Sequence, residues 1–163
     1  MGEEEVTPQA RFAELKKVKS GETFVLGNKT FSYVLIGRHP GSNNVTYRSP
    51  RPERTLGIEL AETTQRETSR IHVLFGRGND GNFYLHNVSE TKLLRFTVSS
   101  NNWGKLGPQE FRGFGNDLQV LQRMIIGWGE SGQDTHKLSV VEASPPLGGN
   151  WSLTFKYIST SAV

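Results

Sequence analysis

The amino-acid sequence predicts an all-β fold in which about ten short strands pack as a sandwich. Glycine is frequent, with 18 residues against 7 prolines, and glycines between short apolar runs are typical of the turns that connect strands. Hydrophobic residues make up 34% and charged residues 21% of the chain, a balance that suits a folded globular protein. A length of 163 residues is enough for one domain with its own core.

Short apolar runs bounded by turn residues give the positions of the expected strands. The run 118–126 fits a helix as well, and we assign it to a strand because it contains β-branched residues and is followed by Gly127 and Gly129. The last two strands form a hairpin around the turn 145–149. The expected strands are 24–26, 31–36, 56–60, 70–75, 82–86, 93–98, 118–126, 137–141 and 151–158.

The N-terminal part, residues 1–21, is expected to be an acidic tail followed by a short helix. Thr7 can cap this helix, Pro8 suits its first position, and Ser20-Gly21 ends it. An apolar stripe near helical spacing is formed by Phe12, Leu15 and Val18. Residues 22–160 are then expected to form the β-sandwich domain.

The absence of cysteine excludes disulfides, thiolate zinc sites and a cysteine nucleophile. Small secreted domains usually carry disulfides, so we expect an intracellular protein, nuclear or cytoplasmic. No segment approaches the length of a membrane span, and Glu3, Glu4 and Glu5 are the opposite of the basic start of a signal peptide. No membrane contact is therefore expected.

Arginines are concentrated in the middle of the chain, where seven lie between residues 38 and 77 and only four glutamates oppose them. Arginine suits bidentate recognition of phosphate or carboxylate, although a solvated basic surface is the other interpretation. The longest irregular stretch, 48–55, holds three of these arginines, and long loops on ordered scaffolds often carry function. Its possible contact residues are Arg48, Arg51 and Arg54.

Three strand ends bear polar side chains that suit an anion site. Gly37-Arg38 ends one apolar strand, and Ser69 precedes a strand on which Arg70 and His72 share one face. Asn87 closes a third strand. Arginine forks and a serine hydroxyl at strand ends can bind a phosphate that carries about −1.5 to −2 charge.

These motifs, Gly37-Arg38, then Ser-Arg-x-His at 69–72, then Leu-His-Asn-Val-Ser at 85–89, resemble in their order the forkhead-associated (FHA) domain over roughly residues 22–125. The resemblance implies an eleven-stranded β-sandwich whose loops bind phosphothreonine peptides in protein–protein interactions and signalling. It implies that Arg38 and Ser69 contact the phosphate and that Arg70 contacts phosphate or peptide backbone. Supporting roles would fall to Gly37, His72, Asn87 and Ser89.

The chain departs from the family pattern after Ser89. The family has Asn-Gly-Thr where this chain has Thr91-Lys92-Leu93, preceded by Glu90. Thr91 would replace the asparagine that anchors the peptide, and it can donate a hydroxyl hydrogen bond without the second group of an amide. Glu90 would bring a like charge toward the phosphate. The resemblance thus predicts a phosphopeptide-binding set of Arg38, Ser69, Arg70 and Thr91.

Other functions remain open. The fold could serve as an FHA-like scaffold or dimerisation domain that needs no phosphate, and the oligomeric state is not predicted. A nucleic-acid-binding sandwich that uses the Arg-rich loop is a further alternative, although a net charge of +3 does not favour nucleic acid as a partner. No enzyme, metal or cofactor is expected, because no Gly-x-Ser-x-Gly motif and no carboxylate pair near the histidines occur. Core or edge packing is preferred over an aromatic platform for Trp103, Trp128 and Trp151.

Overall fold

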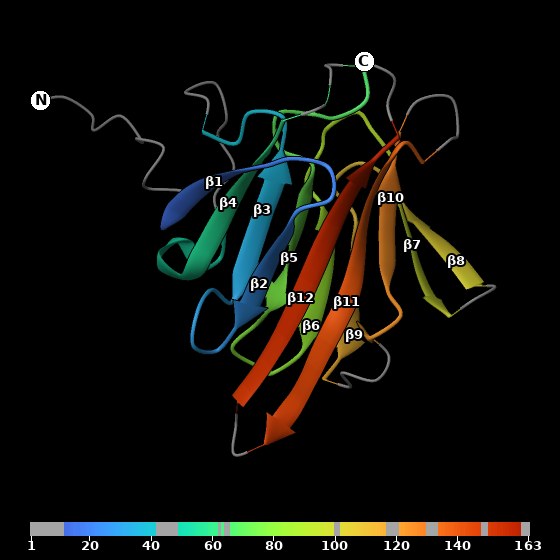
Figure 1. Ribbon diagram of the computed structural model, residues 1–163. Helices are drawn as coiled ribbons and strands as arrows, with labels where there is room; N and C mark the ends of the chain where they lie inside the picture. Colours follow the sequence, from blue (N-terminus) through green and yellow to red (C-terminus); the bar gives the residue numbers. More distant parts are fainter. Residues whose placement is uncertain are drawn as a thin grey trace, which may run out of the picture.

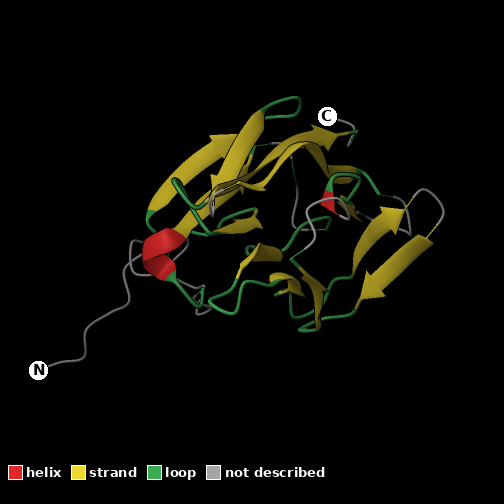
Figure 2. Cartoon of the chain, turned by 90° about the horizontal axis from the view of Figure 1, so that it is seen from below, coloured by secondary structure: helices red, strands yellow, loops and turns green. Residues whose placement is uncertain are grey.

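The computed structural model describes residues 12–41, 49–61, 63, 66–99, 102–116, 121–129, 134–147 and 150–160. Over these ranges the chain forms two sheets of six strands each, whose strands are labelled in Figure 1 and which lie as two layers, one above the other, in Figure 2. The predicted all-β class and sandwich arrangement are confirmed.

The first sheet contains the strands that position the candidate site. Its order is β1 (Glu14–Val18), β4 (Thr55–Leu60), β3 (Tyr33–Gly37), β5 (Val73–Arg77), β6 (Phe83–Asn87) and β9 (Phe111–Gly115). β4 pairs in parallel with both β1 and β3, whereas the other pairs of this sheet are antiparallel. A parallel pair requires a connection that returns along the length of the sheet, so the segment between β3 and β4 begins at one end of the sandwich and finishes at the other.

The second sheet is antiparallel throughout. Its order is β2 (Thr23–Gly27), β12 (Asn150–Ser159), β11 (His136–Leu147), β10 (Ile125–Trp128), β7 (Leu94–Ser99) and β8 (Asn102–Leu106). Along β12, buried and less buried residues alternate from Trp151 to Ile158, as expected for a strand with one face on the core. β11 extends to Leu147, which pairs with Asn150, so residues 145–147 of the predicted turn belong to the strand, and residues 148–149 lie outside the described part.

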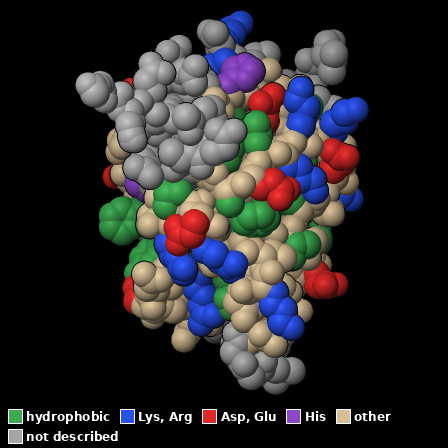
Figure 3. Space-filling view, turned by 90° about the vertical axis from the view of Figure 1, so that its left-hand side faces the viewer, with side chains coloured by type: hydrophobic (Ala, Val, Ile, Leu, Met, Phe, Trp, Pro, Cys, Tyr) green, Lys and Arg blue, Asp and Glu red, His purple; other side chains and the backbone are tan. Residues whose placement is uncertain are grey.

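The short helix predicted to start at Pro8 and to end at Ser20-Gly21 is not formed from residue 12 onward, where its residues are described. Residues 14–18 are β1, an edge strand that is hydrogen-bonded to β4, while residues 1–11 lie outside the described part. The apolar stripe divides between two environments: Phe12 and Val18 are buried, and Leu15 is 46% exposed. Pairing with β4 therefore outweighs a helical pattern that rests on three apolar residues. Figure 3 views the side of the molecule that carries β1, where basic and acidic side chains are interspersed.

Two further expectations about strands need correction. β10 begins at Ile125, and the residues just before it form a turn in which Met124 donates its backbone N–H to Leu121, so the predicted strand 118–126 is wrong over 121–124. The side chains of Leu121 and Met124 are fully buried, which explains why this segment is apolar. β8 and β9 were not expected, because their residues are mostly exposed and show no alternation of apolar and polar side chains.

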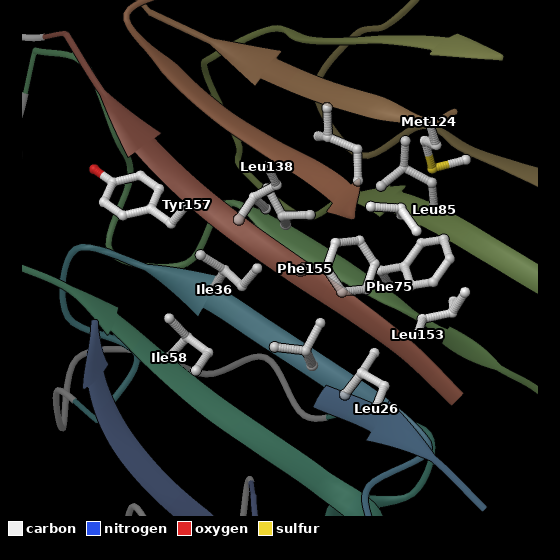
Figure 4. Packing of buried hydrophobic residues seen from close by; sticks show 14 of the residues in the cluster. Leu26, Ile36, Ile58, Phe75, Leu85, Met124, Leu138, Leu153, Phe155 and Tyr157 are labelled. Atoms are coloured by element: carbon white, nitrogen blue, oxygen red, sulfur yellow. The ribbon is translucent and has the colours of Figure 1, made fainter. Parts of the chain in front are cut away.

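The core lies between the two sheets and is continuous (Figure 4). Phe75 from the first sheet meets Phe155 from the second with ring centroids 5.4 Å apart in an edge-to-face arrangement. Each fully buried side chain of this size contributes roughly 1.5–3 kcal/mol through removal from water. A smaller cluster on the outer face of the first sheet contains Phe12, Tyr33, Leu35, Leu74 and Val88. β3 is consequently buried on both faces, which fixes the position of the residue that follows it, Arg38.

Candidate functional site

The end of β3 lies against the segment that precedes β5. Arg38 donates its backbone N–H to the carbonyl of Ser69 over 3.0 Å, and His39 donates to Arg70 over 3.0 Å. Gly37 permits this close approach, because a Cβ atom there would lie 2.0 Å from the Arg70 carbonyl oxygen. The structure thus brings Arg38, Ser69 and Arg70 together, as the sequence analysis expected.

The Arg38 side chain is held by a hydrogen bond from Nε, and its other guanidinium donors are unused. Its Nε donates to the carbonyl of Thr68 over 3.2 Å, and Thr68 is itself fixed by a 2.7 Å hydrogen bond from the indole Nε1 of Trp128. The four remaining guanidinium hydrogens have no acceptor among the described residues. Burial, followed by the charge of Arg70, lowers the pKa of Arg38. Two neighbouring cations without a counter-charge in the described part form a place where an anion would be stabilised.

Ser69 and Ser89 are joined by a hydroxyl–hydroxyl hydrogen bond of 2.6 Å. The Oγ of Ser89 also accepts the backbone N–H of Thr91 over 3.2 Å and that of Lys92 over 3.0 Å. A hydroxyl has one hydrogen and two acceptor positions. Either hydroxyl can be the donor of this bond. When Ser89 donates, the hydrogen of Ser69 is available for another acceptor. We refer to Arg38, Ser69, Arg70 and Ser89 as the Arg38 site.

Asn87 holds the backbone around Ser89. Its side chain is fully buried, and its Oδ1 accepts the backbone N–H of Ser89 over 3.2 Å. Its Nδ2 donates to the carbonyls of Lys92, Leu106 and Gly107 at 2.8–3.0 Å. One amide therefore ties the 88–93 turn to the end of β8. The supporting role that was expected for Asn87 corresponds to this network.

His72 is buried and makes a single side-chain hydrogen bond, between Nε2 and the carbonyl of Leu93 at 3.1 Å. A carbonyl only accepts, so Nε2 carries the hydrogen and Nδ1 is unprotonated. The Nδ1 atom is buried without a hydrogen-bond partner. Burial is the main cause that lowers the pKa of His72 to about 4. His72 is thus a neutral structural residue that links the 66–72 segment to the 88–93 turn.

The pKa of His72 predicts a loss of stability in acid. The folded-state value of about 4 lies below the value of about 6.5 for an unfolded chain, so between these pH values the unfolded state binds the proton and the folded state does not. Lowering the pH from 7 to 4 should cost up to about 3 kcal/mol of unfolding free energy at this residue. The measurement is urea unfolding of the wild type and of His72→Gln at several pH values. The stability advantage of the wild type should shrink in acid, and a difference independent of pH would contradict this assignment.

The turn that departs from the FHA pattern faces solvent. Glu90 and Thr91 are both exposed, and the hydrogen bond described for Thr91 comes from its backbone N–H to Ser89. The structure thus places Thr91 next to the Arg38 site in the chain and leaves its side chain at the surface. Among the described residues, no hydrogen bond joins Thr91 to Arg38.

The loop arginines are not brought to Arg38. Arg51 and Arg54 lie immediately before β4, which runs parallel to β3, whereas Arg38 follows β3. The five residues of β3, at about 3.3 Å each, separate these two ends by roughly 17 Å. Arg54 instead contacts the carbonyls of Gly27 and Asn28. Arg48 falls outside the described residues.

Several residues that support the site were not expected from the sequence. Glu67, in the 66–72 segment, is bonded to Nε2 of buried His136 over 2.7 Å, and Nδ1 of His136 lies 2.7 Å from the Tyr157 hydroxyl. Together with the Thr68–Trp128 bond, this attaches the segment to the second sheet. In the sequence, Glu67 is only a charged residue shortly before an expected strand, and this did not indicate its bond to His136.

Gln109 supports the 88–93 turn through two hydrogen bonds and has an unusual backbone conformation. Gln109 has φ of 70°, and its Nε2 donates to the carbonyls of Val88 and Ser89 at 3.1 and 3.3 Å. A positive φ is uncommon for a residue other than glycine, and here the side chain gains two backbone acceptors. Nothing in the sequence around Gln109 indicated this role.

The three tryptophans do not form a common platform, and the two histidines that contact Trp128, His72 and His136, are buried with it in the core. Trp128 and Trp151 are buried in the core, while Trp103 is 44% exposed and lies beneath the guanidinium of Arg95 at 4.8 Å. Across the described ranges, no group of three or more His, Asp or Glu side chains is arranged to hold a metal ion. Within the same ranges, no helix has the length and apolar character needed to cross a membrane.

Searches against models of protein families, curated proteins and solved structures find no match to this chain. The case for a function therefore rests on the residues of the chain itself.

Proposed function

We propose that the chain is a divergent FHA-like domain that binds a phosphothreonine-containing segment of a partner protein at the Arg38 site. The observation that carries the proposal is the Arg38 guanidinium, which is held through Nε by the carbonyl of Thr68 and whose remaining donors have no acceptor in the described part. The backbone of Arg38 is bonded to that of Ser69, whose hydroxyl supplies a second donor group. This pairing of donors suits the oxygens of a phosphate group.

The electrostatics favour a doubly charged anion. Arg38 and Arg70 are close enough for the charge of one to lower the pKa of the other, and a phosphate would offset this repulsion. Arg38 is half-buried and anchored to Thr68, so less side-chain freedom is lost when it binds. Arg70 is exposed and suits the outer phosphate oxygens or the peptide backbone. The preference for threonine comes from the family resemblance.

The peptide flanking the phosphate should be recognised differently from the family pattern. Thr91 supplies a hydroxyl instead of an amide, and Glu90 adds a negative charge at the surface of the same turn. We expect Glu90 to favour basic residues in the peptide next to the phosphothreonine, through complementary charge. A degenerate phosphothreonine peptide library would reveal this preference as an enrichment of Lys and Arg.

Removing Arg38 should abolish most of the affinity. The test is a titration of the library-selected phosphothreonine peptide by fluorescence anisotropy with the wild type, Arg38→Ala and Ser69→Ala. Loss of charge-assisted hydrogen bonds worth about 1.5–3 kcal/mol should weaken binding roughly 10- to 150-fold for Arg38→Ala. Ser69→Ala should weaken it by about tenfold or less, because it removes one donor.

Arg123→Ala is the matched control, since Arg123 is exposed and lies in the turn before β10. Its affinity should equal that of the wild type, and the unphosphorylated peptide should not bind. Binding that survives Arg38→Ala unchanged would overturn the assigned site. Failure of every phosphothreonine peptide to bind would refute the function and favour a scaffold that needs no phosphate.

A further inference from the structure

The opposite end of the sandwich carries a second basic feature, a surface pocket of about 570 Å³. Three arginines line it, Arg51 and Arg54 from the start of β4 and Arg77 from the end of β5, together with Ser32, Asn79 and Trp151. We call it the Arg54 pocket. Its volume lies in the range of small-ligand sites. Figure 3 shows a group of Lys and Arg side chains in the lower part of the view.

Arg54 is fixed by the backbone with part of its guanidinium unused. Its Nη2 donates to the carbonyls of Gly27 and Asn28 at 3.3 and 3.0 Å, and its Nε donates to the hydroxyl of Ser32 over 3.4 Å. The two Nη1 hydrogens have no acceptor among the described residues. Because Ser32 accepts from Arg54 and is 8% exposed, its own hydroxyl hydrogen is another donor available at the pocket.

Arg77 is held in a similar way from the other side. Its Nε donates to the carbonyl of Gly81 over 2.9 Å, and its guanidinium carbon lies 5.5 Å from the Phe83 ring and 5.7 Å from the Trp151 ring. Aromatic faces orient a guanidinium and lower its freedom. Both Nη atoms of Arg77 remain without an acceptor in the described part. The pocket thus presents pre-oriented donors from two arginines.

Acidic groups border the pocket without lining it. Glu53 lies 3.4 Å from Nε of Arg51 and offsets that charge. Asp80 accepts hydrogen bonds from Tyr84 and Asn82, and these bonds lower its pKa. Arg54 and Arg77 form no ion pair with a described carboxylate. They therefore carry the net positive charge of the pocket.

We propose that the Arg54 pocket is a binding site for a phosphomonoester group, separate from the Arg38 site. A compact dianion fits converging, fixed guanidinium and hydroxyl donors better than an extended polyanion does, because the donors surround one hollow and do not follow a stripe. Asn79, whose Oδ1 accepts from Arg51 over 3.3 Å, leaves its amide hydrogens for the rest of the ligand. The group can come from a small phosphorylated compound or from a phosphorylated side chain. The proposal does not depend on phosphothreonine binding at the Arg38 site.

The test is a titration followed by amide NMR shifts, with inorganic phosphate, phosphoserine as the free amino acid, and a phosphoserine peptide as separate probes. The wild type and Arg38→Ala should show the same saturable shifts around Ser32, Arg54 and Arg77. Arg77→Gln should weaken the binding of phosphoserine by roughly tenfold, because it removes a charge-assisted donor. Arg123→Gln, the matched control, should bind as the wild type does.

The probes distinguish the sources of the ligand. Tighter binding of the peptide than of free phosphoserine identifies a phosphorylated side chain, and equal or weaker binding identifies a small compound. Arg77→Lys keeps the charge and should retain most of the affinity for phosphoserine. If it does, the weaker binding of Arg77→Gln comes from the lost charge and not from a folding defect. Shifts that do not saturate, shifts confined to the Arg38 site, or stronger binding of an unphosphorylated oligonucleotide with internal phosphodiesters only would each overturn the proposal.

Discussion

Replacement of Gly37 by alanine should destabilise the protein by about 4 kcal/mol or more. The added Cβ would lie 2.0 Å from the carbonyl oxygen of Arg70, 2.6 Å from its carbonyl carbon and 2.7 Å from the Cα of Ile71. All three are backbone atoms, so no side-chain rotation relieves the overlap, and the strand end and the 66–72 segment must separate. Separation breaks the backbone bonds that bring Arg38 to Ser69. Urea unfolding would measure the loss.

The matched control is Gly113→Ala on β9. Its added Cβ would first meet the Tyr84 ring at 3.2 Å, and a partly exposed side chain can move by a few tenths of an ångström. We expect this variant to stay within about 1 kcal/mol of the wild type. Gly37→Ala should also lose affinity for any ligand of the Arg38 site, beyond the fraction unfolded. A Gly37→Ala protein as stable as Gly113→Ala would contradict the close approach.

Replacement of Asn87 by alanine should cost about 3–5 kcal/mol. The variant loses the buried amide that accepts from Ser89 and donates to three carbonyls. The bonds to the Leu106 carbonyl and from the Ser89 N–H are buried, so these two groups carry a desolvation penalty when the amide is removed. Because Asn87 holds the backbone at Ser89, its loss should also weaken the Ser69–Ser89 hydrogen bond and with it the affinity of the Arg38 site. Thermal and urea unfolding test the first effect, and phosphopeptide titration tests the second.

Asn102→Ala provides the comparison for Asn87. Asn102 lies exposed at the start of β8, and the hydrogen bond described for it, to Thr97, uses its backbone carbonyl. Loss of this side chain should change stability by no more than about 0.5 kcal/mol. If Asn87→Ala and Asn102→Ala were equally stable, the network around Asn87 would not support the turn.

The strands that could be predicted are those with a clear apolar pattern, which is a continuous run in β3 and an alternation in β6 and β12. β6 and β12 alternate between buried and less buried residues, which is the pattern on which the prediction relied. β8 and β9 lie at the edges of their sheets and are largely exposed, so their sequences carry no such pattern. The prediction for the N-terminal segment was wrong for a different reason. Its apolar residues fitted a helix locally, whereas the strand with which it pairs, β4, lies about forty residues further along the chain.

The Arg38 site was predictable in part because its members lie at strand ends. Arg38 and Ser69 come together through the antiparallel pairing of β3 with β5, although β4 lies between these two strands in the chain. The loop arginines were harder to place. Parallel pairing of β3 with β4 sends the connection back along the sheet, so Arg51 and Arg54 form a separate pocket although they follow Arg38 closely in sequence. Gln109 and Trp128 contribute from strands and turns that only the folded chain brings near.

The attachment of the 66–72 segment to the second sheet has a consequence for the thermodynamics of association. Bonds from Glu67 to His136 and from Trp128 to Thr68 hold this segment before any ligand arrives. Little ordering entropy then remains to be lost on binding, which lowers the cost of complex formation. A calorimetric titration should accordingly show only a small entropic penalty from the protein. The backbone of the 66–72 segment should have almost the same conformation in the free and the bound protein.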